Sequence, residues 1–221
     1  MSRVIGFCRY SIVRKSNAPF KIAKRINYED YERHILSHKR LSARFNLFSR
    51  ITFPSIVESV TNADAAWFRF VILVDEEIPV DALDQLINLT SGYEWCVIEK
   101  VPRDVSISSI ASSVADRLTD GEACYATFRI DDDDALSKSF LKSLNLYVRN
   151  EFVGYAITFP CGVQAFFSAE KNRFVKASKV WRPKLALGLS LISSVECKRR
   201  TVFDLGRHTS VDRRHPMIVV P

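Results

Sequence analysis

Short apolar runs alternate with amphipathic stretches along the first two thirds of this chain, and this alternation restricts the possible folds more than any other feature of the sequence. The apolar runs predict buried strands at 3–12, 67–75, 93–101 and 123–131. Apolar residues recur at helical spacing over 31–60, 80–90, 106–119 and 137–149. Pro54 should break the first of these helices or start a second one. The alternation predicts an α/β fold with a mostly parallel sheet and helices on both faces.

The last third of the chain departs from this pattern. Residues 152–168 predict an antiparallel pair of strands, and residues 183–194 predict a helix with Pro183 in its first turn. Residues 14–28 are polar and basic and contain Pro19, so we expect a loop there. Because we find no repeat, low-complexity tract or linker, we expect a single domain over 1–221 with a mixed C-terminal part.

Composition excludes several classes of protein. With 47% hydrophobic residues the chain has enough apolar material to offset chain entropy, which excludes a disordered protein. The five cysteines are far apart and include no CxxC pair, which argues against a zinc site or a disulfide framework and favours a reducing compartment. The N-terminal apolar run is too short for a signal peptide, and no window approaches the ~18 apolar residues that span a membrane. We therefore expect a cytoplasmic protein.

The charges are distributed unevenly along the chain. The net charge is +7, but residues 1–50 carry +9, residues 51–170 carry −11 and residues 171–221 carry +9. The acidic middle and the basic ends have to meet in one compact fold. They either compensate each other or form a cleft in which an acidic, metal-binding edge faces a basic wall that holds phosphates. We expect no nucleic-acid partner, because no basic run with interleaved aromatic residues is present.

The most informative segment is an apolar strand that runs into four consecutive aspartates, Asp131 to Asp134. Because side chains alternate along an extended chain, Asp131 and Asp133 should share one face, with α-carbons about 6.5–7 Å apart. Asp132 and Asp134 should take the other face or turn into the following loop. Four adjacent anions repel one another, so the end of a sheet tolerates them where a cation lies nearby. A divalent Mn or Mg ion, with its preference for oxygen ligands, is the simplest candidate. The alternative is an acidic helix start, in which the aspartates favour the N-terminus of the next helix.

A metal ion at this place suits phosphate chemistry. A divalent ion that bridges two phosphate oxygens stabilises the charge that grows as a diphosphate leaves carbon. One aspartate can hold the metal while its neighbour holds a ribose hydroxyl. Transfer of a sugar from a nucleotide donor fits this arrangement, and a metal-dependent phosphohydrolase or nuclease that uses the same Asp cluster is the alternative. A third hypothesis is a binding module whose acidic loop meets a basic partner.

An apolar strand that ends in D-x-D, late in a strand–helix domain, resembles glycosyltransferases of the GT-A (Rossmann-like) fold. The narrower resemblance is to the bacterial putative rhamnosyltransferase family, and its pieces occur in order over most of the chain. They are 6–11 (GFCRYS), 40–48 (RLSARFNLF), 52–56 (TFPSI), 70–75 (FVILVD), 128–134 (FRIDDDD) and 186–190 (ALGLS). The resemblance implies a nucleotide-binding half at 1–150 and an acceptor-side half at 151–221.

The resemblance also implies roles for single residues. Asp131 would lie near the donor ribose and the metal, and Asp133 would bind the metal. Arg9 and Ser11 would lie near the nucleotide, and Asp75 could meet the base or ribose. Arg129 either pairs with the aspartates or binds phosphate. The candidate catalytic bases are Asp134 and Glu170. One of the two histidines His208 and His215 could reach the metal or a phosphate.

The expected substrates are a nucleotide-sugar donor and a glycan or lipid-linked acceptor. Lys198, Arg199 and Arg200 form a basic cluster that could approach an anionic membrane, where lipid-linked acceptors are found. We therefore include peripheral association with the inner face of the membrane among the expectations for this chain.

Overall fold

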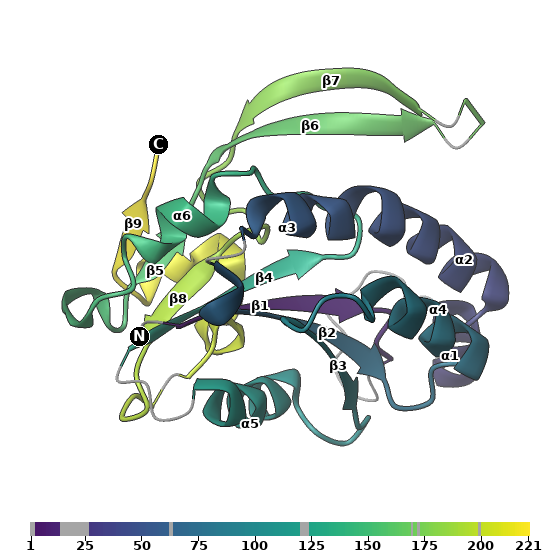
Figure 1. The fold of residues 1–221 in the computed structure, drawn as a ribbon, viewed down its shortest axis with the longest axis horizontal. Coiled ribbons are helices and arrows are strands. Elements are labelled where there is room, and N and C mark those ends of the chain that lie inside the picture. Colours follow the sequence, from purple (N-terminus) through teal and green to yellow (C-terminus); the bar gives the residue numbers. More distant parts are fainter. Residues whose placement is uncertain are drawn as a thin grey trace.

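The computed structural model describes residues 3–13, 27–61, 64–119, 124–168, 170–171, 173–198 and 200–221. Most of the loop expected at 14–28 lies outside these residues. The described chain forms a seven-stranded sheet in the order β3-β2-β1-β4-β8-β5-β9, and a separate hairpin of β6 (Cys161–Ser168) and β7 (Arg173–Trp181) (Figure 1). The strands of the large sheet are β1 (Arg3–Tyr10), β2 (Phe68–Asp75), β3 (Cys96–Val101), β4 (Tyr125–Asp131), β5 (Ala156–Thr158), β8 (Ser190–Ser193) and β9 (Met217–Val219).

The first four strands are parallel, as the sequence predicts. β1 pairs with β2 on one side and with β4 on the other, and β2 pairs with β3. β8 then runs antiparallel to β4, which makes the sheet mixed beyond this point. The chain passes from β1 to β2 on one side and returns to β4 on the other, so the strand order reverses between β1 and β4. Open α/β sheets bind ligands at such a point, outside the carboxyl ends of the strands.

Helices lie in all four predicted stretches, but the stretch 31–60 is divided at 36–37, and only 140–145 of the stretch 137–149 is an α-helix. The helices are α1 (Tyr28–Ile35), α2 (His38–Leu47), α3 (Phe53–Ser59), α4 (Val80–Thr90), α5 (Ile107–Thr119) and α6 (Phe140–Asn145). A π-helical turn, η1 (Phe48–Thr52), joins α2 to α3, and the 3-10 turns are η2 (Asp64–Ala66), η3 (Asn150–Phe152), η4 (Val202–Leu205) and η5 (His208–Arg213). Pro54 lies in the first turn of α3, directly after η1, so a second helix starts at this proline as the sequence predicts. In the part of the chain that is described, no helix has the length and apolar character to cross a bilayer.

Helices cover both faces of the sheet, which confirms the expected α/β class. The alternating side chains of β1 divide between two cores. Cys8 and Tyr10 pack with residues of α2, α3, α4 and α6, whereas Ile5 and Phe7 pack against α5. Gly6 lies under the ring of Phe128, and a Cβ atom at Gly6 would come within 2.4 Å of the Phe128 Cζ atom. The centre of the sheet is therefore close-packed.

Two predictions for the last third are wrong. Residues 152–168 do not pair with each other, because β5 joins the large sheet while β6 (Cys161–Ser168) pairs with β7 (Arg173–Trp181). Pro160 separates the two strands, and the partner of β6 comes later in the chain. Residues 183–194 do not form a helix, because turns there lead into β8. Gly188 has φ +68 at this place, and Phe140 Cε2 lies 2.9 Å from where its Cβ would be.

Candidate functional site

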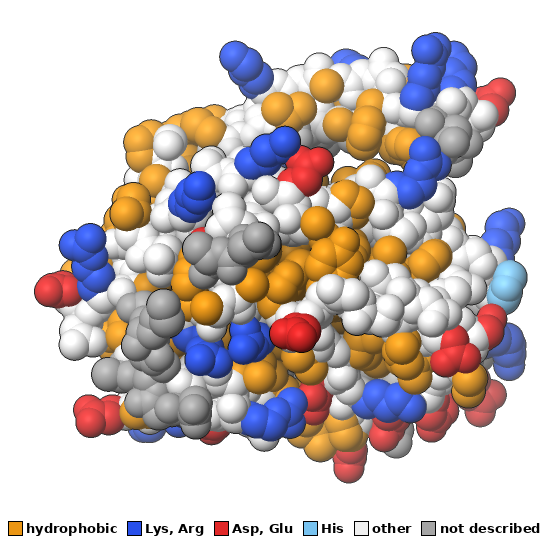
Figure 2. Space-filling model, viewed as in Figure 1, with side chains coloured by type: hydrophobic (Ala, Val, Ile, Leu, Met, Phe, Trp, Pro, Cys, Tyr) orange, Lys and Arg blue, Asp and Glu red, His pale blue; other side chains and the backbone are white. Residues whose placement is uncertain are grey.

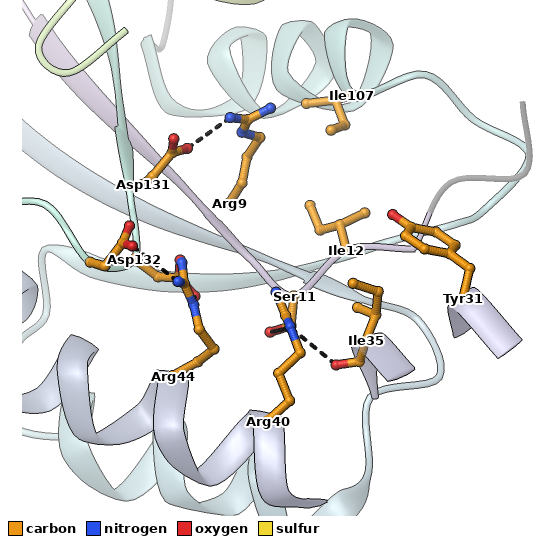
Figure 3. Close-up of a pocket in the computed structure, with 11 residues that line it drawn as sticks. Arg9, Ser11, Ile12, Tyr31, Ile35, Arg40, Arg44, Ile107, Asp131 and Asp132 are labelled. Atoms are coloured by element: carbon orange, nitrogen blue, oxygen red, sulfur yellow. Dashed lines mark hydrogen bonds and ion pairs between the residues drawn. The ribbon is translucent and has the colours of Figure 1, made fainter. Parts of the chain in front are cut away.

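A cavity of about 300 Å³ opens at the carboxyl ends of β1 and β4, where the strand order reverses. Arg9 of β1 is the register partner of Asp131 of β4, so the two strand ends bring these side chains together. The residues that line the cavity are Arg9, Ser11, Ile12, Tyr31, Ile35, Arg40, Arg44, Ile107, Asp131, Asp132 and Asp133 (Figure 3). The wall thus combines three consecutive carboxylates with three arginines.

The aspartates do not follow the alternation expected of a strand. β4 ends at Asp131, and the Asp134 amide donates to the Asp131 carbonyl over 3.2 Å, which closes a turn. In this turn Asp132 lines the cavity beside Asp131 and Asp133, and its side chain is only 3% exposed. Of the two alternatives for Asp132 and Asp134, the structure therefore has the turn, because the extended backbone stops at Asp131.

Each cavity carboxylate has an arginine partner. Arg9 Nη2 lies 2.7 Å from Asp131 Oδ1. Arg44 binds both oxygens of Asp132 through one edge of its guanidinium, with Nε donating to Oδ2 over 2.8 Å and Nη2 facing Oδ1, and its Nη1 donates to Asp133 Oδ2 over 3.1 Å. Such paired bonds fix the orientation of a carboxylate and stabilise its negative charge. The arginine wall and the acidic edge expected from the charge distribution therefore meet in this cavity.

Sequence reasoning missed Arg40 and Arg44 as site residues. They lie four residues apart on α2, and this spacing places both side chains on one face of the helix. Arg40 Nη1 donates to Ser11 Oγ over 3.0 Å and to the Ile35 carbonyl over 3.1 Å. The spacing of Arg40 and Arg44 indicates two arginines on one helix face, but the sequence does not show which strand end that face covers.

Ser11 has an unusual backbone conformation where it lines the cavity. Its φ is +51, in the left-handed region that residues other than glycine seldom adopt. Such a conformation costs about 1–3 kcal/mol and tends to occur at functional sites. Here it turns the chain sharply after β1, and the Ser11 side chain is held by Arg40.

Arg129 lies on β4, on the same face as Asp131 and behind it. It is 8% exposed, and its buried Nε and Nη2 atoms have no hydrogen-bond partner among the described residues. Burial lowers the pKa of Arg129 to about 10, and the charge of Arg9 acts in the same direction, so the guanidinium stays charged at neutral pH. Burial and the charge of Arg129 also lower the pKa of His208. Buried guanidinium N–H groups without an acceptor are costly, and a bound anion would offset that cost.

Asp134 follows the cavity aspartates and is half-buried. Burial raises its pKa to about 6, and the neighbouring charges of Asp133 and Asp131 act in the same direction. Glu170, the other candidate base, is exposed in the turn between β6 and β7 and does not line the cavity.

Asp75 also lies outside the cavity lining. Its side chain is fully buried and accepts hydrogen bonds from the backbone amide of Val13 over 2.8 Å and from Arg103 Nε over 3.1 Å. Arg103 in turn pairs with Glu32 of α1 over 2.9 Å. Asp75 thereby ties the chain after β1, and through Arg103 helix α1, to the end of β2. Of the residues predicted from the sequence, the structure brings Arg9, Ser11, Asp131 and Asp133 into one cavity, places Arg129 and Asp134 beside it, and leaves Asp75 and Glu170 outside.

The carboxylates of the cavity can be compared with the needs of the expected divalent cation. In the part of the chain that is described, no group of three or more His, Cys, Asp or Glu side chains is arranged to hold an ion. However, Asp131 and Asp133 are 38% and 46% exposed, so both carboxylates remain accessible. Mg²⁺ is commonly bound by one or two carboxylates together with substrate phosphates rather than by a cage of protein ligands. Asp131 and Asp133 therefore fit a divalent cation that is bound by two carboxylates together with substrate phosphates.

Comparisons with known proteins name a family for this chain. A family model described as "Putative rhamnosyl transferase" matches residues 3–221. No curated protein matches the chain. A solved structure of 4-diphosphocytidyl-2C-methyl-D-erythritolsynthase from Anaerococcus prevotii DSM 20548 is 11% identical, with a TM-score of 0.43, over 99% of this chain and 86% of that one. An inositol-1-phosphate CTP transferase from T. maritima is 14% identical, with a TM-score of 0.37, over 99% and 85% of the two chains.

Proposed function

The chain belongs to the family described as putative rhamnosyl transferase, a family of glycosyltransferases, and on this premise we propose that it moves a sugar from a nucleotide-sugar donor to a glycan or lipid-linked acceptor. The sugar in the family description is rhamnose. The observation that carries the proposal is the cavity at the ends of β1 and β4, where three carboxylates and three arginines share one wall. This combination suits a diphosphate and its counter-ion.

In this proposal the arginines bind the donor diphosphate. Arg9, Arg40 and Arg44 line the cavity, and Arg129 adds a buried positive charge behind Asp131. The unpartnered Nε and Nη2 atoms of Arg129 support an anionic ligand, because a bound phosphate or the field of a nearby one offsets the cost of burying them. Ser11 and Asp131 would position the nucleotide end of the donor.

Asp131 and Asp133 would hold a divalent cation, Mn²⁺ or Mg²⁺, together with the donor phosphates. When bound, such an ion neutralises charge on the departing diphosphate. Arg9 and Arg44 keep the two carboxylates in place before the ion arrives, and the carboxylates would exchange part of that pairing for the metal. Sugar transfer that does not depend on a metal ion would contradict this part of the proposal and leave the transfer itself supported.

We assign Asp134 as the catalytic base. In sugar transfer with inversion, the acceptor hydroxyl oxygen attacks the anomeric carbon, the bond from that carbon to the diphosphate oxygen breaks, and the hydroxyl proton passes to a carboxylate. A base works best when its pKa lies near the working pH, and the pKa of Asp134 is raised to about 6. The acceptor would be bound by the half of the chain formed by 151–221.

The first test is calorimetry with a panel of nucleoside diphosphates, each with and without Mn²⁺. We expect one nucleotide to bind at least tenfold more tightly with the metal, and Asp133→Asn to remove most of that gain. Asp84→Asn, an exposed aspartate on α4, is the matched control and should leave binding unchanged. If no nucleoside diphosphate binds under either condition, the proposal is wrong.

The second test separates sugar transfer from hydrolysis. A metal-dependent phosphohydrolase or nuclease with the same aspartates would cleave generic phosphate esters or phosphodiesters without any sugar acceptor. For a transferase, we expect slow release of nucleoside diphosphate from the matching nucleotide sugar and no cleavage of p-nitrophenyl phosphate or its diester. Rapid cleavage of either ester, lost in Asp133→Asn, would favour the hydrolase.

A membrane-facing location forms part of the proposal because lipid-linked acceptors lie there. The cluster that the sequence offers for this contact is interrupted, since Arg200 forms an ion pair with Asp116 of α5 and Arg199 lies outside the described residues. Lys198 is exposed. A different surface of the molecule has a stronger basic and apolar character.

A further inference from the structure

The β6–β7 hairpin extends over α2 and α3 as an arm (Figure 1). Most of its residues are exposed on both faces. Figure 2 shows apolar and basic side chains over this arm and an opening between part of it and the body of the molecule. An isolated two-stranded hairpin is marginally stable in water, and apolar side chains gathered on an exposed surface mark a contact with another partner. The arm therefore has the character of a docking surface.

The charge of the arm points to an anionic partner. Residues 161–182 contain five basic residues, Lys171, Arg173, Lys176, Lys179 and Arg182, and one acidic residue, Glu170. Among the described residues, none of these five side chains forms an ion pair. In the cavity, by contrast, each carboxylate has an arginine partner. No carboxylate among the described residues therefore pairs with the basic side chains of the arm.

The two faces of the arm differ in what they contact. Phe167 and Phe174 are register partners on one face, and Arg50 Cζ of η1 lies 5.9 Å from the Phe167 ring centroid, so this face contacts the body at Phe167, while Val163 further along the same face is 67% exposed. Phe166 and Lys176 are register partners on the opposite, outer face. Phe166 is 49% exposed, and Val175, at the irregularity in the register, is 52% exposed.

We propose that the outer face of the β6–β7 arm docks the protein on an anionic bilayer, with Phe166 entering the headgroup region and Lys176 and Arg173 contacting lipid phosphates. Aromatic side chains next to basic ones on a flat surface are the combination that binds membrane interfaces. A second copy of the chain is a weaker occupant, because two arms with this excess of positive charge repel each other. This inference deepens the proposed function by locating the surface of a lipid-linked acceptor, but the docking is measurable without donor or acceptor.

The test is flotation of the full chain with vesicles of phosphatidylcholine alone and with vesicles that contain 30% phosphatidylglycerol. We expect binding to the anionic vesicles, little binding to the neutral ones, and loss of binding at high salt. Each basic side chain near an anionic surface contributes about fivefold to the partition coefficient. The double variant Phe166→Ser/Lys176→Glu should therefore lower partition at least tenfold.

The chain offers a matched control on the other face of the same hairpin. Val163 and Lys179 are register partners, so Val163→Ser/Lys179→Glu removes one apolar side chain and reverses one charge, as the outer-face variant does. We expect it to lower partition less than threefold. Both pairs lie outside the core, and equal thermal midpoints for wild type and both variants would show that the fold is intact.

The other outcomes overturn the inference. Absence of binding to anionic vesicles excludes the bilayer, and equal loss in both double variants contradicts the assignment to the outer face. A dimer in light scattering that Phe166→Ser/Lys176→Glu converts to a monomer would identify a second copy as the occupant. Calorimetry with nucleoside diphosphates, run on the same samples, reports on the proposed function separately. A protein that binds nucleotide but not vesicles contradicts this inference alone, and one that binds vesicles but no nucleotide contradicts the proposed function alone.

Discussion

The acidic turn at the end of β4 and the β6–β7 arm are both rich in charge, but they use it in opposite ways. In the turn, Arg9 and Arg44 hold Asp131, Asp132 and Asp133 at fixed positions, and the Asp132 side chain is nearly inaccessible to water. In the arm, the basic side chains are exposed and no described carboxylate pairs with them. Charges arranged in opposing pairs shape a local site for chemistry, whereas unopposed charges on an exposed surface are available to an external partner.

The two candidate bases lie one in each region, which allows the largest expected effect to be measured against a control. Asp134→Asn should lower the turnover rate by about 10²–10⁴-fold with little change in KM, because it removes the proton acceptor. Glu170→Gln, in the exposed turn of the arm, should stay within about twofold of wild type. Steady-state kinetics with the donor found by calorimetry provides the measurement.

The pH dependence sharpens the same prediction. A base is active when deprotonated, and the pKa of Asp134 is raised to about 6 by burial and by Asp133 and Asp131. A cation bound to Asp131 and Asp133 would offset the part that these two charges contribute, whereas the effect of burial persists. The wild-type rate should therefore fall at a pH between the ordinary aspartate pKa of about 3.9 and about 6. If Glu170→Gln lowers the turnover rate more than Asp134→Asn does, the catalytic base lies in the arm and the comparison is contradicted.

The next effect concerns stability. Arg103→Ala leaves the fully buried Asp75 without its charged partner, and breaking a buried pair in this way costs about 3–5 kcal/mol. Arg182→Ala, in the arm, removes an exposed side chain whose hydrogen bond goes to Gln164, and it should change the free energy of unfolding by less than about 0.5 kcal/mol. Urea unfolding of both variants makes the comparison. Equal losses would mean that the arm is as integral to the fold as the sheet.

Glycines in the two regions give a smaller contrast. Gly6→Ala places a Cβ atom 2.4 Å from Phe128 Cζ and should cost about 1–3 kcal/mol through displacement of that ring. Gly162→Ala, in β6, meets only Val180 Cγ2 at 3.9 Å and should be neutral or stabilise by up to about 1 kcal/mol, because alanine restricts the unfolded chain. Thermal unfolding of both variants checks the difference. A destabilising Gly162→Ala would show that the arm is packed more tightly than its exposure indicates.

The sequence predicted the parallel part of the fold well, because strands that are buried on both faces are continuous apolar runs in the sequence. β2 is buried along nearly its whole length, so its apolar run 68–75 is unmistakable. β6 was predicted as a strand but paired wrongly, and β7 and β8 were missed, for different physical reasons. β6 and β7 have few buried positions and therefore no burial pattern to detect, and β8 is a short strand whose apolar residues fall at a spacing that a helix also allows.

The same limit explains what was and was not predicted of the site. Asp131 and Asp133 were predicted because strand, turn and carboxylates are contiguous in sequence. Arg40 and Arg44 were missed because their contacts to Ser11 and Asp132 span 29 and 88 residues. Asp75 was placed near the donor because it ends a strand, but the amide of Val13 and the guanidinium of Arg103, each distant in sequence, already occupy its oxygens.

The smallest expected effect tests whether the arm opens independently of the sheet. Phe167 and Phe174 meet edge to face with ring centroids 5.5 Å apart, and such a cross-strand pair contributes about 0.5–1 kcal/mol. Phe174→Ala should therefore speed hydrogen exchange of the β6 and β7 amides by about two- to fivefold, while the amides of β1 and β4 exchange as in wild type. Val163→Ala, which removes an exposed apolar side chain without an aromatic partner, should change neither set. If exchange in β1 and β4 rises together with exchange in the arm, the two regions open as one unit, and the contrast between a fixed site and an independent docking arm does not hold.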